Sequence, residues 1–291
     1  MRYYAYFPGC SAESTASALG ISTQAITKPL DIELKELEDW TCCGSTPYSG
    51  VSGLESICVA ARDLALGEKT GLDMVTPCSA CYITLNKANS HLKEHPQLKE
   101  KVDDALTAAN LEYHLKTRVR HLVEVLMNDV TPDSIASKVK RSLKGLKVAP
   151  YYGCQLVRPG YGFDEPEFPQ SLDRLTESLG AEAVPFPLKA RCCGGSLIIS
   201  EEEAALGLIR KILANAVENG AQLIVTPCPL CQTNLDAYQS RVHGKFKTKF
   251  NMPVLFISQL IGIALGLGSK ALGLNKNIVS PAKVLAPYLK G

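Results

Sequence analysis

The segment Arg191-Cys192-Cys193-Gly194-Gly195 has a counterpart at Thr41-Cys42-Cys43-Gly44, and both occupy the same place in a longer pattern. Each adjacent cysteine pair is followed by a Thr-Pro-Cys-x-x-Cys run, at residues 76–81 in the first case and 226–231 in the second. The pairs and the runs are both offset by 150 residues along the chain. The sequence therefore contains two copies of one cysteine-bearing unit.

A single Gly-Cys dipeptide precedes each pair, Gly9-Cys10 in the first copy and Gly153-Cys154 in the second, at an offset of 144 residues. Ten of the eleven cysteines thus fall into two sets of five. The first set is Cys10, Cys42, Cys43, Cys78 and Cys81, and the second set is Cys154, Cys192, Cys193, Cys228 and Cys231. We predict that each set binds one group through five thiolates.

The composition is that of an ordinary globular protein. The chain has 291 residues, of which 46% are hydrophobic and 7% aromatic, enough for one large or two medium domains with an apolar core. The formal net charge is +2, and basic residues are interspersed with acidic ones. This pattern indicates neither nucleic acid nor an anionic membrane surface as a partner.

The sequence carries no recognisable targeting or spanning segment. The N-terminal residues 1–7 lack a long apolar core with a cleavage site, so we predict a cytoplasmic, reducing location, where cysteines more often serve metal or redox chemistry than disulfides. The apolar run at residues 252–268 is interrupted by Ser258 and Gln259 and is shorter than the roughly 20 residues of a spanning helix. We predict a buried strand leading into a helix there.

Hydrophobic periodicity predicts the same order of elements in both copies. In the first copy we expect strands at residues 2–7, 30–37 and 73–76 and helices at 14–27 and 54–68. In the second copy we expect strands at 148–152, 183–186 and 222–226 and helices at 171–179 and 201–217. The first copy has a longer, charged insert at residues 91–120.

Alternation of strands and helices is typical of parallel α/β units. We predict an α/β fold of two tandem Rossmann-like parallel-sheet units, residues 1–144 and 145–291, related by internal duplication and a pseudo-twofold axis. Thr131-Pro132-Asp133 is a helix start near the boundary. In such units functional loops leave the carboxyl ends of the strands, so the three cysteine loops of each copy should converge there.

Several kinds of site use cysteines in this way. Structural zinc takes four ligands, and Cys-x-x-Cys supplies half of such a site, but the fifth cysteine argues against it. Adjacent cysteines diverge along an extended chain, which favours a centre larger than one ion, with the following glycines allowing a bent loop. Iron–sulfur clusters meet that requirement best. Zinc and dithiol–disulfide redox chemistry stay open as alternatives.

The other cysteine and the histidines are predicted to have mainly structural roles, and three basic residues could act near the second set. Cys58 aligns with Leu208, a predicted core position, so we expect it to pack as a small apolar residue. His121 aligns with Phe256 and is predicted to lie in the core or against the bound group. Residues of the charged insert should be solvated, namely His91, His95 and His114. Three basic residues flank the second copy's loops and could neutralise an anionic substrate or cluster, Arg158, Lys189 and Arg191.

Paired segments of the form Cys…Cys-Cys-Gly…Cys-x-x-Cys resemble those of the CCG-domain family, and two in one chain resemble the B-type subunits of heterodisulfide reductases. The resemblance runs from Gly9-Cys10 to residues 254–259. It implies two noncubane [4Fe-4S] clusters, one on each cysteine set named above, with a small-molecule disulfide cleaved between them. Each half-disulfide sulfur would go to an iron of one cluster, and electrons would arrive singly.

The resemblance also implies partners. The chain has no G-x-G-x-x-G after a strand and no C-x₂-C-x₂-C-x₃-C run, so it lacks the usual flavin, nicotinamide and cubane-cluster motifs. Electrons would come from a ferredoxin-like iron–sulfur subunit and, through it, a flavoprotein subunit. Two alternatives remain: an iron–sulfur electron-transfer subunit of a quinone-linked oxidoreductase, and a non-catalytic zinc-bound assembly subunit.

Overall fold

The computed structural model describes residues 1–45, 48–158 and 160–289. Its strands form two four-stranded sheets, and all observed strand pairs are parallel. The order in the first sheet is β2 (Ile32–Glu36), β1 (Arg2–Tyr6), β3 (Met74–Thr76) and β4 (Val119–His121). The order in the second sheet is β6 (Glu182–Ala183), β5 (Lys147–Pro150), β7 (Leu223–Thr226) and β8 (Val254–Phe256). The α/β fold of two duplicated parallel-sheet units is confirmed.

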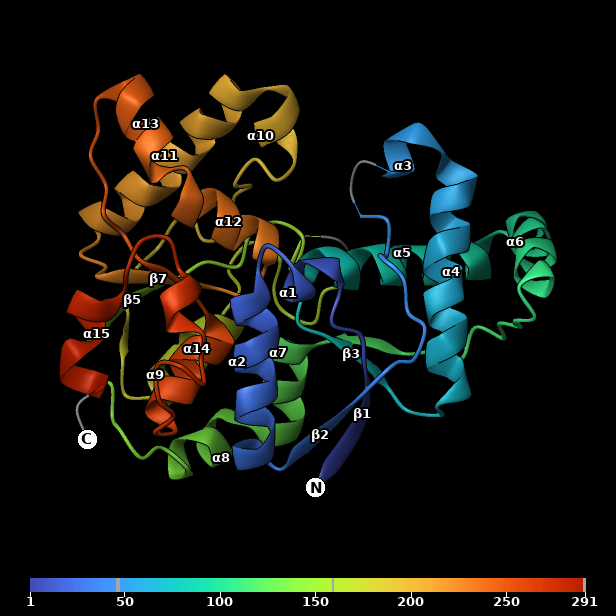
Figure 1. Ribbon diagram of the computed structural model, residues 1–291, viewed down its shortest axis with the longest axis horizontal. Helices are drawn as coiled ribbons and strands as arrows, with labels where there is room; N and C mark the ends of the chain where they lie inside the picture. Colours follow the sequence, from blue (N-terminus) through green and yellow to red (C-terminus); the bar gives the residue numbers. More distant parts are fainter. Residues whose placement is uncertain (46–47, 159, 290–291) are drawn as a thin grey trace.

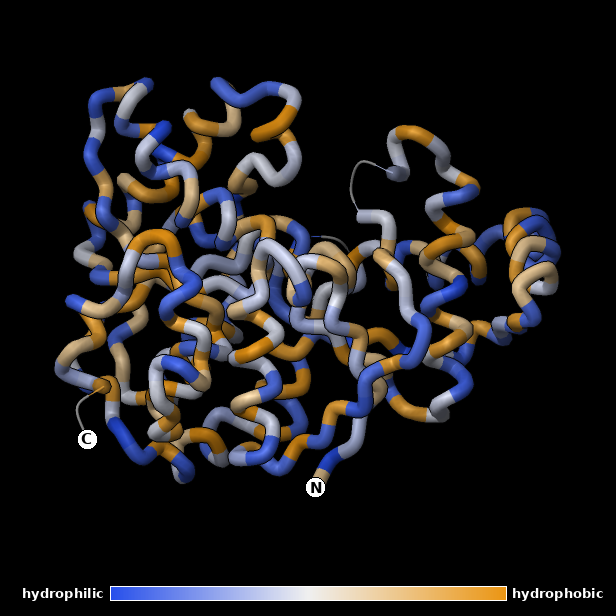
Figure 2. Tube along the Cα trace, in the orientation of Figure 1, coloured by the Kyte–Doolittle hydropathy of each residue, from blue (hydrophilic) through white to orange (hydrophobic). Residues whose placement is uncertain are grey.

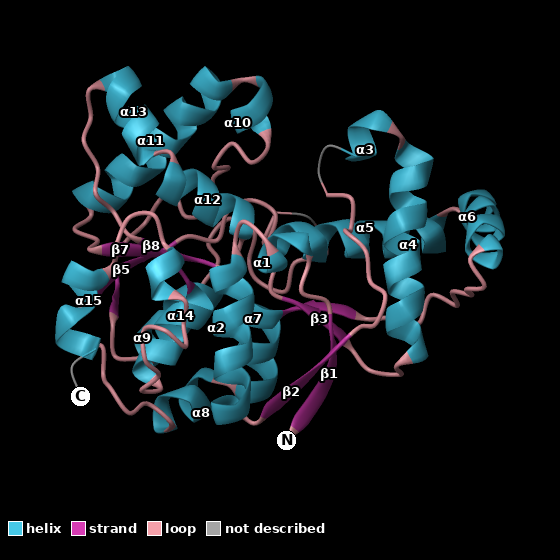
Figure 3. Ribbon diagram, in the orientation of Figure 1, coloured by secondary structure: helices cyan, strands magenta, loops and turns pink. Residues whose placement is uncertain are grey.

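Four helices lie between the two sheets and join them (Figures 1 and 3). They are α2 (Ser17–Thr27) and α7 (Leu122–Val125) from the first copy, and α9 (Ser171–Ser178) and α14 (Ile257–Ala264) from the second. Helix α2 packs on α14, and α7 packs on α9. Because α2 and α9 follow the first strand of their copies while α7 and α14 follow the fourth, these contacts are reciprocal, as a pseudo-twofold axis requires.

Outer helices cover the other face of each sheet. The first copy uses α4 (Gly53–Lys69), α5 (Ser79–Glu94) and α6 (Pro96–Ala108), and the second uses α11 (Glu202–Glu218), α12 (Pro229–Ala237) and α13 (Gln239–Phe246). Orange and blue alternate along α4 in Figure 2, as expected for a helix with one buried face. Short helices complete the chain: α1 (Cys10–Glu13), α3 (Tyr48–Val51), α8 (Pro132–Ser137), α10 (Leu197–Ser200) and α15 (Ala282–Leu289).

The strands alternate between two cores because successive side chains point to opposite faces of a sheet. In β7, Leu223 and Val225 enter the core shared with the first copy, whereas Ile224 enters the outer core of the second. In β1, Tyr4 faces the shared core and Ala5 the outer one. The shared core therefore contains side chains from both copies, because the inner helices of one copy pack on their own sheet and on the inner helices of the other.

The predicted elements differ from the observed ones mainly at their ends. The helix expected at residues 14–27 begins at Ser17, and Cys10 starts a separate helical turn instead of standing in an open turn. The strand expected at 183–186 is reduced to residues 182–183. Thr131 caps α8 as predicted, accepting the Ser134 N–H at 3.3 Å. The predicted boundary at residues 144 and 145 stays a prediction.

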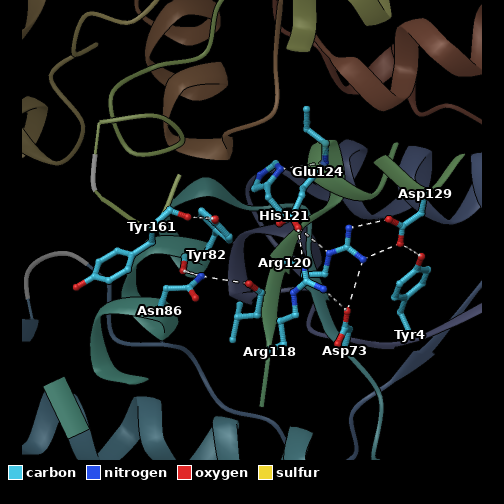
Figure 4. Close-up of polar contacts among 12 residues, drawn as sticks. Tyr4, Asp73, Tyr82, Asn86, Arg118, Arg120, His121, Glu124, Asp129 and Tyr161 are labelled. Carbon is cyan, nitrogen blue, oxygen red and sulfur yellow. Dashed lines mark hydrogen bonds and ion pairs between the residues drawn. The ribbon is translucent and has the colours of Figure 1, made fainter. Parts of the chain in front are cut away.

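A buried ion network fixes the end of the first sheet (Figure 4). Arg120 on β4 is 4% exposed, and its guanidinium donates to Glu124 at 2.8 Å and to Asp129 at 2.6 and 2.8 Å. The Tyr4 hydroxyl on β1 donates to the same Asp129 carboxylate at 2.5 Å. Arg120 lowers the pKa of the Asp129 carboxyl, because its charge stabilises the ionised form. The network thus ties β1 to β4 and to the π-helical turn Leu126–Val130.

Cys58 lies on α4 and packs at the edge of the first copy's outer core. Both Cys58 and its counterpart Leu208 are half-buried, so the predicted core position is only partly enclosed. Burial raises the pKa of the Cys58 thiol, which disfavours the thiolate.

We predict that Cys58→Ala costs on the order of 1 kcal/mol of stability, because it removes one half-buried sulfur, and leaves metal content unchanged. Urea denaturation and metal analysis would measure both quantities, with Cys43→Ala as the comparison that should lose metal. Loss of metal from Cys58→Ala would identify it as a ligand.

Candidate metal centres

All ten cysteines of the two sets lie on loops or helix starts at the carboxyl ends of strands. In the first copy, Cys10 begins α1 after β1, Cys42 and Cys43 lie in the loop after β2, and Cys78 and Cys81 lie at the start of α5 after β3. The second copy repeats this order, with Cys154 after β5, the pair Cys192 and Cys193 after β6, and Cys228 and Cys231 at the start of α12 after β7.

The three loops of each copy bring their sulfur atoms together. In the first set, Cys10 Sγ lies 3.5 Å from Cys42 Sγ, and Cys43 Sγ lies 3.4 Å from Cys81 Sγ. In the second set, Cys193 Sγ lies 3.5 Å from Cys231 Sγ. The Cys154 thiol also donates to the Cys192 sulfur. All eleven cysteines are free.

Two glycines make room for these sulfurs. Gly9 has φ +77° and Gly153 has φ +68°, conformations that residues with a side chain rarely adopt. A Cβ atom at Gly9 would lie 2.8 Å from Cys81 Sγ, and one at Gly153 would lie 2.8 Å from Cys231 Sγ. Each Gly-Cys dipeptide therefore requires glycine for its backbone conformation and for its contact with the last cysteine of the set.

One thiol in each adjacent pair is shifted toward the thiolate. The pKa of Cys43 is lowered to about 5, chiefly by its hydrogen bond with the Cys42 thiol and next by its hydrogen bond with Cys81. The pKa of Cys192 is lowered to about 6 by the Cys154 thiol, with help from the Gly194 N–H and the Arg158 charge. The thiolate is the metal-binding form, so Cys43 and Cys192 are the sulfurs that these bonds favour as ligands, whereas hydrogen bonding raises the pKa of Cys81 and Cys154.

Neighbouring polar groups hold the cysteine loops. Thr76 Oγ1 accepts the Cys78 N–H at 3.3 Å, and Thr226 Oγ1 accepts the Cys228 N–H at 3.5 Å, which accounts for the Thr in both Thr-Pro-Cys runs. In the second copy, Asn234 Nδ2 donates to the carbonyl oxygens of Cys193 at 3.2 Å and Gly195 at 3.0 Å. Side chains of this kind orient ligands.

Asp63 holds the corresponding loop in the first copy. Its side chain is fully buried on α4, and Oδ1 accepts the N–H of Thr41, next to Cys42, at 2.8 Å. Burial raises the pKa of the Asp63 carboxyl to about 6. Asp63 and Asn234 were missed from the sequence, because only the folded loops bring them close to the cysteine pairs.

The two cysteine sets face each other across the boundary between the copies. The pKa of the Cys228 thiol is lowered chiefly by its bond with Cys231, and the Ala80 N–H from the first copy also donates to the Cys228 sulfur. Leu230, between Cys228 and Cys231, packs against the outer cores of both copies. The two Cys-x-x-Cys turns are therefore in direct contact.

Two cavities adjoin this contact. One of about 190 Å³ is lined by all five cysteines of the second set and, from the first copy, by Ser79. The other, of about 320 Å³, is lined by Gly44 and Ser45 beside the first set and by Lys87 and His91 farther along α5. Gln155, the residue after Cys154, lines both. The two cavities therefore share one lining residue, and the larger one borders the loop after Cys43 without being lined by a cysteine of the first set among the described residues.

The other candidate residues have mixed outcomes. His121 is 1% exposed and lies 3.4 Å from the Ser79 hydroxyl, in agreement with the predicted core or lining position. Arg158 donates to the Ala190 carbonyl at 3.1 Å, and Lys189 is paired with Asp173 at 3.1 Å. Arg191 is exposed. Of the three basic residues, Arg158 is the one whose charge acts on a cysteine.

The three histidines of the insert differ in their exposure to solvent. His95 is exposed and the His114 side chain is 60% exposed, as predicted, although His114 Nδ1 also lies 3.0 Å from Glu68. His91 is half-buried in the larger cavity.

The donor set fits an iron–sulfur cluster. Each copy gathers five cysteines with a glycine that lets the last sulfur approach the backbone, the five of the second set line one cavity, and cysteine thiolates are the usual ligands of such clusters. Within the described ranges 1–45, 48–158 and 160–289, no three Cys, His, Asp or Glu side chains are arranged to hold one metal ion.

A family of proteins with a cysteine-rich domain, called CCG, matches the chain twice, at residues 4–86 and 148–236. The chain belongs to the CCG-domain family. The two matches coincide with the two cysteine-bearing units, which confirms the resemblance noted in the sequence.

Relatives of this CCG-domain protein are subunits of oxidoreductases. It is 38% identical to the 8-methylmenaquinol:fumarate reductase membrane anchor subunit of Wolinella succinogenes, over 97% of this chain and 98% of that one. It is 32% identical to the B subunit of the ferredoxin/F420H2-dependent CoB-CoM heterodisulfide reductase of Methanosarcina acetivorans, over 96% of this chain and 95% of that subunit. A protein of Archaeoglobus profundus that is named as similar to the heterodisulfide reductase B subunit is 34% identical, over 90% of each chain.

A solved structure shares the fold. The crystal structure of a hypothetical protein from Helicobacter pylori superimposes with a TM-score of 0.79 at 16% identity, over 96% of this chain and 52% of the other. Among the residues that the structure describes, no helix combines the length and apolarity that a membrane crossing requires.

We predict that Asp63→Asn weakens the pH dependence of stability. Because the folded pKa of Asp63 is raised from 3.8 to about 6, its contribution is complete below pH 4 and is lost as the pH rises through 6. The whole shift of about two pH units corresponds to at most about 3 kcal/mol, of which roughly 1.4 kcal/mol falls between pH 5 and pH 8, and the neutral amide would not lose it. Urea denaturation at pH 5 and pH 8 would measure this.

Asp236 is the internal reference for that experiment, because burial raises its pKa to about 6 as well. The Asp63→Asn protein should therefore keep the part of the decrease in stability between pH 5 and pH 8 that comes from Asp236. An unchanged difference between pH 5 and pH 8 would contradict the assignment to Asp63.

Proposed function

We propose that this chain is the iron–sulfur subunit of a multi-subunit oxidoreductase and reduces, or reversibly forms, a disulfide of thiol cofactors between two noncubane [4Fe-4S] clusters. Cys10, Cys42, Cys43, Cys78 and Cys81 would hold the first cluster, and Cys154, Cys192, Cys193, Cys228 and Cys231 the second. The observation that carries the proposal is the direct contact of the two Cys-x-x-Cys turns, in which Leu230 packs against the outer cores of both copies and Ser79 lines the cavity of the second set.

The clusters, when bound, would supply one-electron transfer and iron sites for sulfur. The chain's own residues bring the two sites together and exclude water from them. Cys43, Cys78, Cys81, Cys193, Cys228 and Cys231 are all buried, whereas Cys10, Cys42 and Cys192 are exposed. The buried cysteines would set the cluster environment, and the exposed ones mark the side from which a partner or substrate approaches.

A disulfide suits this arrangement because its two sulfurs are chemically alike and each can face one copy. Reduction takes two electrons and two protons and gives two thiols. The cavity of about 190 Å³ offers space at the second set, and Gln155 also lines the larger cavity beside the loop that follows Cys43. Electrons would come from a ferredoxin-like subunit and a flavoprotein, a proposal supported by relatives that are named as subunits of larger enzymes.

A second candidate is an electron-transfer subunit of a quinone-linked oxidoreductase. It is favoured by the 38% identity to the Wolinella succinogenes subunit, whose enzyme is named for 8-methylmenaquinol and fumarate. Reduction of the anaerobically purified chain's clusters by a menaquinol, without any response to disulfides, would favour this candidate over disulfide chemistry.

We predict about eight irons and matching labile sulfide per chain, four for each cysteine set. Anaerobic purification followed by iron, sulfide and zinc analysis, with absorption and EPR spectra, would test this. A colourless protein with one or two zinc ions and no labile sulfide would support the zinc-bound assembly subunit instead.

We also predict that both copies act on one disulfide. Cys43→Ser and Cys193→Ser each remove a buried ligand from one set and should leave the opposite cluster in place. After chemical reduction, neither variant should complete a fast single round of disulfide cleavage, because each lacks one of the two sulfur-accepting sites. Fast cleavage by either variant would reject shared cleavage while leaving the cluster assignment standing.

A further inference from the structure

The duplication is broken at two adjoining positions in the first copy. Ser79, within the first Cys-x-x-Cys, corresponds to Pro229 in the second copy. Strand register pairs Thr76 with His121 and Thr226 with Phe256, so His121 corresponds to Phe256. A polar pair in the first copy therefore replaces an apolar pair in the second, at the turn where the copies meet.

Ser79 projects into the site of the other copy. It is fully buried and lines the cavity of about 190 Å³ that is formed by the second cysteine set. Among the described residues that line this cavity, it alone comes from the first copy. The first turn of α5 thus places the Ser79 hydroxyl at the second site.

His121 determines which way the Ser79 hydroxyl can donate. The Val123 N–H donates to His121 Nδ1 at 3.1 Å, so the proton of the neutral ring is on Nε2. The single Nε2–H is shared between the Pro77 carbonyl and Ser79 Oγ, which lies 3.4 Å away. Because Nε2 carries the proton, Ser79 cannot donate to it, and the hydrogen of the Ser79 hydroxyl can point into the cavity.

The ring is held firmly in this orientation. Burial keeps His121 neutral by lowering its pKa to about 3. The Tyr82 ring meets it edge-on at 5.7 Å between centroids, and the Tyr82 hydroxyl donates to the Tyr161 carbonyl at 2.5 Å. Figure 4 shows His121 and Tyr82 next to the Arg120 ion network, which fixes the strand that carries the histidine.

We propose that Ser79, positioned by His121, donates a hydrogen bond to an anionic sulfur bound at the second cysteine set. This rests on the proposed function, because that sulfur belongs to the cluster or to its ligands. A hydrogen bond to sulfur stabilises the more negative, reduced state and so raises the reduction potential. Pro229, the counterpart of Ser79 in the second copy, has neither a hydroxyl nor an N–H that it could donate to the first cysteine set. The hydrogen bond from Ser79 therefore raises the potential of the second site and has no counterpart from Pro229 at the first.

An EPR-monitored redox titration of the full chain, purified with its clusters, tests this without any turnover. The signal of the second site is identified as the one that disappears in Cys193→Ser. Ser79→Ala should move its midpoint to a more negative potential, leaving the other signal and the iron content unchanged. Ser79→Thr, which keeps the hydroxyl, should restore the original midpoint, and His121→Phe should shift it in the same direction as Ser79→Ala.

Ser22→Ala is the matched control, because Ser22 is equally buried but bonds to Ser258 at 2.7 Å in the contact between α2 and α14. It should leave both midpoints unchanged. An unshifted second-site midpoint in Ser79→Ala, or equal shifts of both signals, would overturn the inference. If Ser79→Ala loses iron, unshifted midpoints in His121→Phe would overturn it instead. Absence of any iron–sulfur signal from the unaltered protein would overturn the proposed function itself.

Discussion

The packing of α2 on α14 and of α7 on α9 is the contact on which the rest of the molecule depends. These helices fill one apolar core with side chains from both copies, and the inner face of each sheet rests on that core. The inner helices of each copy pack on their own sheet, and their outward apolar faces are buried by the inner helices of the other copy. The same contact sets the position of the strand ends and hence of every cysteine loop.

This constraint explains why two separate cysteine sets meet. Within a copy, three loops converge because they leave the same ends of neighbouring strands. Between copies, convergence requires the reciprocal helix packing, which brings Ala80 to Cys228 and Leu230 into both outer cores. Local topology therefore accounts for each set, and tertiary packing accounts for their pairing.

The sequence predicts the cysteine set within each copy well, and it predicts the pairing of the two sets poorly. The repeat of Cys-Cys-Gly and Thr-Pro-Cys indicates both units and their strand order, because period and spacing are local properties. Ser79, Asp63 and Asn234 could not be assigned, since their contacts join segments far apart in the chain. For Ser79, the mismatch with Pro229 is the one signal visible in the sequence.

The shared core also has a consequence for the origin of the chain. A protein consisting of one such unit would expose the apolar faces of its two inner helices and would have to form a homodimer to cover them. In that homodimer every substitution would appear on both sides of the axis. Fusion of the two units into one chain removes this coupling, so that a histidine can stand on one side and a phenylalanine on the other.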